Sequence, residues 1–292
     1  MGMTFQTFDL LKKNIDEFGE LGDVLTLGRL GNQIDKKKLK LLGLESNIAF
    51  SEEYCDTIFT EYFGANLVHS IDNSNFEGAN IVFNMNEELK NITKQYDTII
   101  DIGTSEHVFN VNQSLKNISK LCKKGGRIIH CLPANNQCGH GFWQFSPELF
   151  FSLYDNSNGY QSTKLHLIDS YDDKTYWQIN KKPKNERLEL NSFTPLYIFV
   201  ATTKKSENII QKAQQSDYEY VWNKKSDNTQ FDTIKKSSLS IVWKKIKDKV
   251  KIFFRNNYLF NKIFLKYEKK KLFLKNFYKT NKNLIELTYD IK

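Results

Sequence analysis

The stretch "YDTIIDIGTSEHVFNVNQSLKNISKLCKKGGRIIHCLP", residues 96–133, decides the fold of this chain. Its two apolar runs, "YDTIIDIG" (96–103) and "GRIIHCL" (126–132), are typical of strands that are buried on both faces of a parallel sheet. The segment between them, "VNQSLKNISKLCKKGG" (111–126), is predicted to be a helix with a basic last turn and a glycine stop. A strand, a helix and a second strand in this order indicate a parallel βαβ unit.

The same alternation extends to both sides of this unit. Residues 4–19 and 51–64 are predicted to be helices, the second with Ser51 as its N-cap, and Ser146 with Pro147 begins another. Further strands are predicted over "DVLTLG" (23–28), "NLVHSID" (66–72), "NIVFNMN" (80–86), "STKLHLIDSY" (162–171), "TYWQIN" (175–180) and "PLYIFVAT" (195–202). We therefore expect an α/β fold whose mixed sheet has a parallel core and an antiparallel edge. Ligands of such sheets bind outside the carboxyl ends of the strands, so the segments after the first five strands should line one crevice.

The composition is that of a globular protein. No apolar run approaches the ~20 residues needed to span a bilayer, and the N-terminus lacks the charged-then-apolar pattern of a signal peptide. The four cysteines (Cys55, Cys122, Cys131 and Cys138) have no CxxC spacing and are interpreted as buried free thiols. These features predict a cytoplasmic protein, and the bias toward Lys, Asn and Ile indicates a bacterial source.

The net charge of +8 is concentrated in the C-terminal part of the chain. Residues 235–282 carry a local charge of +14, which leaves −6 for the rest, so we predict a main domain over 1–205 and a basic, aromatic helical tail over 206–292. Apolar residues recur among the lysines at helical spacing, which favours an amphipathic helix on an anionic membrane surface, at the inner face of the membrane. Packing on the main domain, or on the second subunit of a homodimer, is the alternative. No nucleic-acid partner is expected.

Residues 96–133 resemble the class I S-adenosylmethionine-dependent methyltransferases. The matching features are the fourth strand of that family, a glutamate-histidine pair that opens the next helix, a lysine-glycine-glycine turn and the fifth strand. The resemblance extends over residues 20–160. It implies a Rossmann-like fold and S-adenosylmethionine as the cofactor.

The family's glycine-rich turn follows its first strand, where the backbone must approach the cofactor. The matching stretch is "VLTLGRLGNQ" (24–33), which implies cofactor contacts for Thr26, Gly28 and Gly31. It departs from the family pattern, because Thr26 stands where an acidic residue is usual and Arg29-Leu30 replaces a closely spaced second glycine. A simple strand-to-loop turn is the alternative interpretation.

The later strand ends supply further candidates for cofactor binding. Asp72 matches the carboxylate that accepts from the ribose hydroxyls, although an Asx-turn in "DNSN" would also explain it. Asn86 would lie near the adenine or cap a helix. The resemblance also places the run Ile102-Gly103-Thr104 beside the cofactor, together with Glu106.

Catalytic candidates lie on the loop "NNQCGHGFWQFSPELF" (135–150) and on the glutamate-histidine pair. His140 is predicted to take the acceptor's proton, Gln144 to orient the acceptor, and Phe142 and Trp143 to stack on it. The alternatives are that the aromatic residues belong to the core and that His140 is structural. His107 is interpreted first as packing against the fifth strand and second as catalytic. No metal site is predicted, because no pair of histidines makes a recognisable motif; Asp101 with Glu106 is a weak magnesium candidate.

These residues predict a methyltransferase that acts on oxygen, with a small-molecule or glycan acceptor. The family branch that the chain most resembles suggests a carbohydrate, in capsule or lipopolysaccharide biosynthesis. The alternative is a non-catalytic, methyltransferase-like binding or scaffold protein, tethered to a membrane or to a glycan-synthesis partner. The altered glycine turn favours this alternative.

Overall fold

A computed structural model describes residues 2–226, residue 266 and residues 284–288. Short gaps in the first range fall at residues 42, 45–46, 48–49, 173–174, 187, 189, 191, 193, 208–209 and 211–212. The basic segment 235–282 therefore lies almost entirely outside the described residues, and its amphipathic helix stays a prediction.

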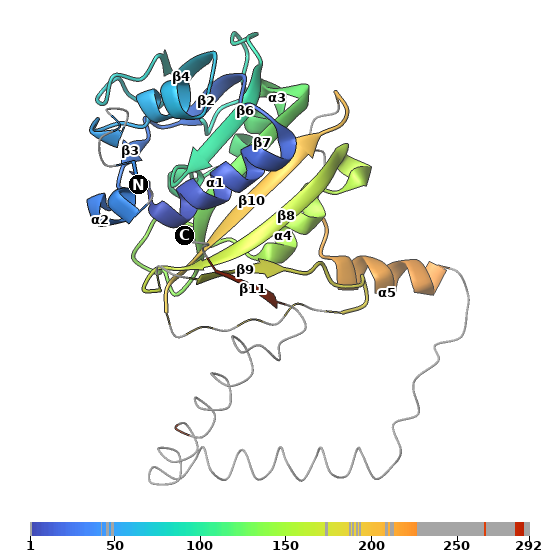
Figure 1. The fold of residues 1–292 in the computed structure, drawn as a ribbon. Coiled ribbons are helices and arrows are strands. Elements are labelled where there is room, and N and C mark those ends of the chain that lie inside the picture. Colours follow the sequence, from blue (N-terminus) through green and yellow to red (C-terminus); the bar gives the residue numbers. More distant parts are fainter. Residues whose placement is uncertain are drawn as a thin grey trace. The chain divides into compact units, whose positions relative to one another are not determined.

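Within the described residues, nine strands form one sheet (Figure 1). In spatial order they are β11 (Leu284–Thr288), β9 (Thr175–Ile179), β8 (Tyr160–Asp169), β10 (Leu196–Lys204), β7 (Cys122–Asn135), β6 (Tyr96–Ile102), β2 (Asp23–Leu27), β4 (Leu67–Asp72) and β5 (Ile81–Val82). The strands from β7 to β5 pair in parallel, whereas β10, β8, β9 and β11 pair antiparallel. The expected parallel core with an antiparallel edge is thus confirmed.

The strand order reverses between β2 and β6. The chain builds outward from β2 through β4 to β5, returns to the other side of β2 with β6, and continues to β7. A Rossmann-like sheet with this doubly wound order binds its ligand at the reversal, outside the carboxyl ends of the strands. The fold therefore directs attention to the residues that follow β2, β4 and β6.

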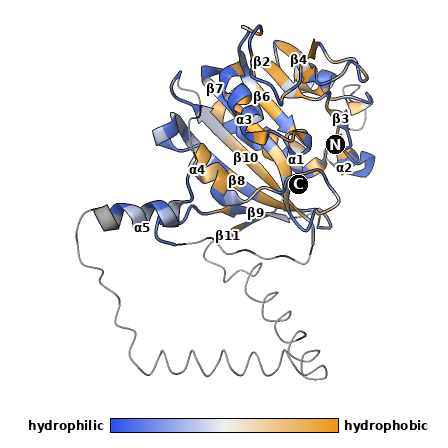
Figure 2. Ribbon diagram, turned by 180° about the vertical axis from the view of Figure 1, so that it is seen from behind, coloured by the Kyte–Doolittle hydropathy of each residue, from blue (hydrophilic) through white to orange (hydrophobic). Residues whose placement is uncertain are grey.

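Helices cover both faces of the sheet, which gives three layers (Figures 1 and 2). The helix α1 (Phe5–Phe18) lies on one face, while α3 (Val111–Leu121) and α4 (Pro147–Leu153) lie on the other. The N-caps of these three helices are Thr4, Asn110 and Ser146. The sequence indicated only Ser146, whose hydroxyl accepts from the Leu149 N–H. Figure 2 shows the hydrophobic residues concentrated on the central strands and the inner sides of these helices.

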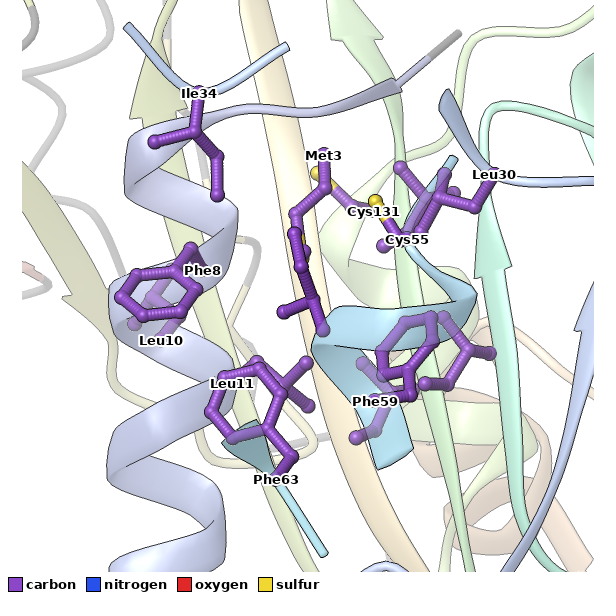
Figure 3. Packing of buried hydrophobic residues seen from close by; sticks show 14 of the residues in the cluster. Met3, Phe8, Leu10, Leu11, Leu30, Ile34, Cys55, Phe59, Phe63 and Cys131 are labelled. Carbon is purple, nitrogen blue, oxygen red and sulfur yellow. The ribbon is translucent and has the colours of Figure 1, made fainter. Parts of the chain in front are cut away.

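The hydrophobic core on the α1 side combines three segments that are distant in sequence (Figure 3). Phe8 and Leu11 of α1 lie beside Phe59 and Phe63, and Cys131 of β7 forms part of the floor. All five side chains are buried, and Phe8 and Phe63 have ring centroids 5.3 Å apart. Burial of large side chains contributes about 1.5–3 kcal/mol each, so this cluster holds α1 against the sheet.

The helix predicted over 51–64 is wrong in its first half. Residues 51–55 form turns and bends with an isolated β-bridge from Tyr54 to Gly31, and the helical conformation begins only at Asp56, before the π-helix Ile58–Tyr62. The reason is a tertiary contact: the Cys55 N–H donates to the Leu30 carbonyl at 2.9 Å, and the Asn32 N–H donates to the Glu53 carbonyl at 2.7 Å. These bonds extend the small strand β3 (Gly31–Asn32), which pairs with β1 (Gly2–Met3), and a helix cannot form where the backbone is already engaged. The short helix α2 (Lys36–Leu41) was not predicted.

Two helix boundaries in the segment 96–133 also differ from the prediction. Glu106 and His107 do not open α3 but lie on a separate 3-10 turn (Ser105–His107), because Asn110 caps the helix four residues later. The helix then ends at Leu121 rather than at the glycines, since Cys122 is extended and already pairs with Tyr96 as the first residue of β7. The lysine-glycine-glycine turn is an irregularity within that strand.

The described residues divide into two compact units. The larger comprises the described residues of 2–181, 194–215 and 284–288; the smaller comprises the described residues of 182–193 and the helix α5 (Ser216–Ser226). The pairing of β11 with β9 was not predicted. No helix in the described part of the chain is long and apolar enough to cross a membrane. Three of the four free cysteines are buried, as predicted, whereas Cys138 is exposed.

Candidate active site

Three strand ends meet at Gly28, directly after β2. This residue adopts φ = 69°, a left-handed conformation that favours glycine, and its N–H donates to the Ile71 carbonyl at 2.8 Å. A Cβ added at Gly28 would lie 3.1 Å from Thr104 Oγ1 and 3.7 Å from Asp72 Oδ2. The predicted residues from β2, β4 and β6 therefore converge on one point at the carboxyl edge of the sheet.

The Asp72 carboxylate faces this point without a partner. Among the described residues no hydrogen bond or ion pair engages its oxygens, so the alternative Asx-turn does not form. The backbone carbonyl of Asp72 accepts from the Phe83 N–H at 2.7 Å, which holds the strand end in place. A half-buried carboxylate with free acceptor positions beside a bare glycine is suited to bind vicinal hydroxyl groups.

The two departures from the family's glycine turn have internal partners. The buried Thr26 hydroxyl donates to the Gly28 carbonyl at 2.8 Å, so it holds the turn. The Arg29 guanidinium stacks 4.1 Å from the Tyr54 ring, lies 3.3 Å from Asp56 and donates to the Glu77 carbonyl at 3.1 Å. Arg29 thus connects the loop after β2 to the loop after β4.

The other predicted cofactor contacts divide into two groups. The Thr104 hydroxyl donates to the Leu27 carbonyl at 2.7 Å, and Gly103 (φ = 80°) follows the buried Ile102, so this run lies at the carboxyl end of β6 beside the end of β2. Gly31, by contrast, lies in β3, where an added Cβ would meet nothing closer than 3.9 Å. The Asn86 side-chain oxygen already accepts from the Asn110 N–H at 2.8 Å and so braces the start of α3.

The loop after β7 closes over Glu106. The N–H groups of Phe142 and Trp143 donate to the Glu106 carbonyl at 2.8 and 3.3 Å. Gly141 permits this approach, because it adopts φ = 77° and a Cβ there would lie 2.8 Å from the same carbonyl oxygen. The loop is therefore anchored on the turn that follows β6, beside Thr104.

Closure of the loop brings Glu106, His107 and His140 together. His140 Nε2 lies 3.2 Å from Glu106 Oε1, and His107 Nε2 lies 3.9 Å from the same oxygen. The Glu106 side chain is fully buried, yet neither of its oxygens has a hydrogen bond of good geometry among the described residues. Burial, with a smaller contribution from Asp101, raises the pKa of Glu106 to about 8. The His107 side chain is 54% exposed and lies beside the His140 ring, with centroids 5.6 Å apart.

A buried polar chain supports this turn from below. His130 Nδ1 donates to Asp101 Oδ2 at 2.8 Å, and its Nε2 accepts from the Tyr154 hydroxyl at 2.6 Å, in the tautomer that fits both partners. The second Asp101 oxygen accepts from the Ser105 N–H at 3.2 Å. Asp101 therefore fixes the position of the residue before Glu106, a role that sequence reasoning missed when it considered Asp101 as a metal ligand.

Aromatic residues of the loop are divided between core and surface. Phe145 is buried, whereas Phe142 is 68% exposed and meets the exposed Phe109 edge-to-face at 6.2 Å. Trp143 is partly exposed, and its indole N–H donates to the Val108 carbonyl at 2.9 Å. Phe109 was not predicted as part of the site. The Gln144 side-chain oxygen accepts from the Gln137 N–H at 2.9 Å and so stabilises the loop.

A cavity of about 170 Å³ opens between the start of α1 and the carboxyl ends of β6 and β7. Its polar lining consists of uncharged side chains: Thr4, Gln6, Thr7, Gln33, Ser170 and Tyr197. The Tyr197 ring also meets the His140 ring edge-to-face, with centroids 6.2 Å apart. The cavity therefore adjoins the Glu106–His140 pair through a shared side chain.

No protein-family model matches the sequence, and no curated protein matches it. Solved structures with a similar arrangement include TehB from Haemophilus influenzae (15% identity, TM-score 0.39, covering 68% of this chain and 62% of that one). Others are the N-methyltransferase NodS from Bradyrhizobium japonicum (10%, 0.39, 68% and 94%) and an S-adenosylmethionine-dependent methyltransferase from Clostridium acetobutylicum (12%, 0.28, 73% and 77%).

Proposed function

We propose that this protein is an S-adenosylmethionine-dependent methyltransferase that acts on a hydroxyl group. The convergence of Gly28, Asp72 and Thr104 at the reversal point of the sheet carries the proposal. Gly28 leaves room for close approach of a ligand to the backbone, and the unpartnered Asp72 carboxylate supplies acceptors for ribose hydroxyls. The residues therefore fit the cofactor, which when bound supplies an electrophilic methyl group.

The Glu106–His140 pair is the place where the acceptor hydroxyl is activated. In the transfer, the acceptor oxygen forms a bond to the methyl carbon, the carbon–sulfur bond breaks with its electron pair left on sulfur, and the acceptor's proton is released at this pair. An aliphatic hydroxyl needs such help, because it does not ionise at neutral pH. His140 is only one-third exposed and adjoins the polar cavity, so the activated oxygen is partly shielded from water.

Two features support a carbohydrate acceptor, as in the synthesis of a cell-surface glycan. The cavity beside His140 combines the apolar side chains of Ile102, Cys131 and Ile168 with amides and hydroxyls, and no charged side chain lines it, which suits a neutral molecule that has both apolar faces and hydroxyl groups. The exposed rings of Phe109, Phe142 and Trp143 offer apolar surfaces next to the same loop, and the faces of sugar rings pack on such surfaces. In this arrangement Phe142 and Trp143 bind the acceptor, as the sequence suggested.

Calorimetry with S-adenosylmethionine and S-adenosylhomocysteine tests the cofactor site. Asp72→Ala removes hydrogen bonds to a charged group, which are worth about 1.5–3 kcal/mol, and should weaken binding by roughly 10- to 150-fold. Asp16→Ala, at an exposed carboxylate of α1, is the matched control and should bind as the parent does. Binding that is unchanged in Asp72→Ala would remove the ribose role of this residue.

The acceptor side of the site is tested separately. His140→Ala should lower turnover with little loss of cofactor affinity, because His140 is not among the residues that converge on Gly28. Acceptors can be sought by incubating glycan precursors with labelled cofactor and following the label by mass spectrometry. Equal turnover in His140→Ala and the parent would refute the role of His140 in activation.

A non-catalytic binding protein is the second candidate, and Arg29 is the observation that favours it. Its side chain lies across the loops after β2 and β4, where the methyltransferase family has a bare glycine. If calorimetry detects no heat of binding for S-adenosylmethionine or for S-adenosylhomocysteine, that result favours the non-catalytic binding protein. In both cases the basic segment 235–282 is suited to hold the protein at an anionic membrane, and truncation after Thr233 should then reduce binding to vesicles that contain anionic lipid.

A further inference from the structure

The buried carboxylate of Glu106 lacks hydrogen-bond donors that would compensate a negative charge. It is fully buried, and the loop that covers it contributes backbone N–H groups to its carbonyl but none to its carboxylate. Neither carboxylate oxygen has a hydrogen bond of good geometry among the described residues, and His140 Nε2, the nearest nitrogen, is likewise without one. A buried carboxylate without donors is costly, so a proton or a cation must neutralise it.

The surroundings of Glu106 favour a metal cation. Glu106, His107 and His140 each offer one ligand atom, and these atoms all lie within 4.8 Å of one another. Two ligand atoms that are each ~2.1 Å from a tetrahedral ion lie roughly 3.4 Å apart. The observed separations from Glu106 Oε1, 3.2 Å to His140 Nε2 and 3.9 Å to His107 Nε2, lie on either side of that value.

We propose that Glu106, His107 and His140 bind a divalent transition-metal ion. Two imidazoles and one carboxylate form a donor set that suits Zn²⁺, Mn²⁺ or Fe²⁺ better than Mg²⁺ or Ca²⁺, which prefer oxygen ligands. Three protein ligands leave positions open for water or a substrate oxygen, as in catalytic rather than structural metal sites. His107 is the exposed member, so the site is open to solvent on the side of this residue.

Sequence spacing alone did not reveal this site. Glu106 and His140 lie on different connections of the sheet, and only the left-handed conformation of Gly141 folds the loop back onto Glu106. The Asp101–His130–Tyr154 chain adds rigidity from below, because it holds the Ser105 N–H next to Glu106. Support of this kind fixes the orientation of metal ligands.

The metal would also explain how an aliphatic hydroxyl is activated, a consequence that rests on the proposed methyltransferase function. A cation in this position would lower the pKa of a bound acceptor hydroxyl, so the hydroxyl would release its proton at the Glu106–His140 site without His140 acting as a free base. Metal binding itself does not depend on that function and is measured without cofactor or acceptor.

The experiment uses the full chain after treatment with a chelator. Titration with Zn²⁺ and with Mn²⁺, followed by calorimetry and by elemental analysis after gel filtration, should show one equivalent bound. Glu106→Gln and His140→Ala should each weaken binding by more than about 100-fold, because loss of a direct ligand exceeds the 10- to 100-fold effect of an outer-sphere change. His140→Ala should keep the affinity of the parent for S-adenosylhomocysteine, and both variants should keep the circular dichroism spectrum of the parent.

Cys138→Ser is the matched control, since Cys138 is an exposed thiol on the same loop and an alternative zinc ligand. This variant should bind metal as the parent does, and the Co²⁺-loaded parent should show no thiolate charge-transfer band. Binding that is lost in Cys138→Ser, or equal in the parent and in the Glu106→Gln, His140→Ala double variant, would overturn the proposal. If metal binds as expected but neither cofactor form does, the metal site stands and the proposed function fails.

Discussion

Replacement of Gly28 by alanine should weaken cofactor binding in addition to destabilising the fold. Gly28 adopts φ = 69°, where a side chain costs about 1–2 kcal/mol. The new Cβ would lie 3.1 Å from Thr104 Oγ1, and Thr104 is held by its hydrogen bond to the Leu27 carbonyl. We expect the free energy of unfolding to fall by about 1–2 kcal/mol, which corresponds to a fall in Tm of roughly 2–8 °C.

Gly64 provides the matched control for this variant. It adopts φ = 66°, and a Cβ there would meet nothing within 4 Å. Gly64→Ala therefore carries the same backbone cost without filling the crevice, whereas the methyl group of Gly28→Ala would lie 3.7 Å from Asp72 Oδ2, in the space assigned to the cofactor. By calorimetry, Gly28→Ala should bind S-adenosylhomocysteine at least about 10-fold more weakly than Gly64→Ala, a difference of about 1.4 kcal/mol. Equal affinities in the two variants would refute the placement of the cofactor against Gly28.

Three further predictions concern stability and thiol chemistry. Burial lowers the pKa of His166 to about 4. Because the unfolded chain binds a proton at this residue below pH 6.5 and the folded chain does not, the free energy of unfolding of the parent should fall by about 3 kcal/mol between pH 6.5 and 4. In denaturant titrations the free energy of unfolding of His166→Phe should fall less over the same range. Tyr154→Phe leaves the buried His130 Nε2 without its donor and should cost about 1–3 kcal/mol, whereas Tyr171→Phe, at an exposed tyrosine, should cost almost nothing in the same titrations. A thiol reagent should modify one cysteine in the folded chain and four in denaturant, and Cys138→Ser should abolish the reaction of the folded protein.

The sheet was predictable because its strands carry their own signals. The runs that became β6 and β7 are mostly apolar in their central parts, and residues 98–102 and 128–133 are buried throughout, as in strands that are covered on both faces. The same property placed Asp72 correctly, because a polar residue at the end of a buried strand must lie at the carboxyl edge of the sheet. By contrast, the N-terminal half of the helix predicted over 51–64 failed, since its capping signal at Ser51 is local and the backbone bonds to Leu30 and Asn32 are not.

The candidate site was predictable residue by residue but not as an arrangement. Glu106, His107 and His140 were all singled out, yet nothing in their spacing indicates that the three ligand atoms lie within 4.8 Å of one another. The proximity of His140 to Glu106 depends on two backbone features: the left-handed conformation of Gly141 and the hydrogen bonds to the Glu106 carbonyl. Phe109 was missed for the same reason: it joins Phe142 only after the loop has closed.

The altered glycine turn can be weighed in physical terms. Thr26 and Arg29 occupy positions where the methyltransferase family has an acidic residue and a glycine, but both side chains are engaged with the protein itself, one with Gly28 and the other with the loop after β4. Neither substitution touches the Asp72 carboxylate, which stays open toward Gly28. The change therefore concerns the part of the crevice after β2 and leaves Asp72, the proposed ribose-binding residue, unaltered. For that reason loss of binding in Asp72→Ala is a more direct test of the proposed function than any change at Arg29.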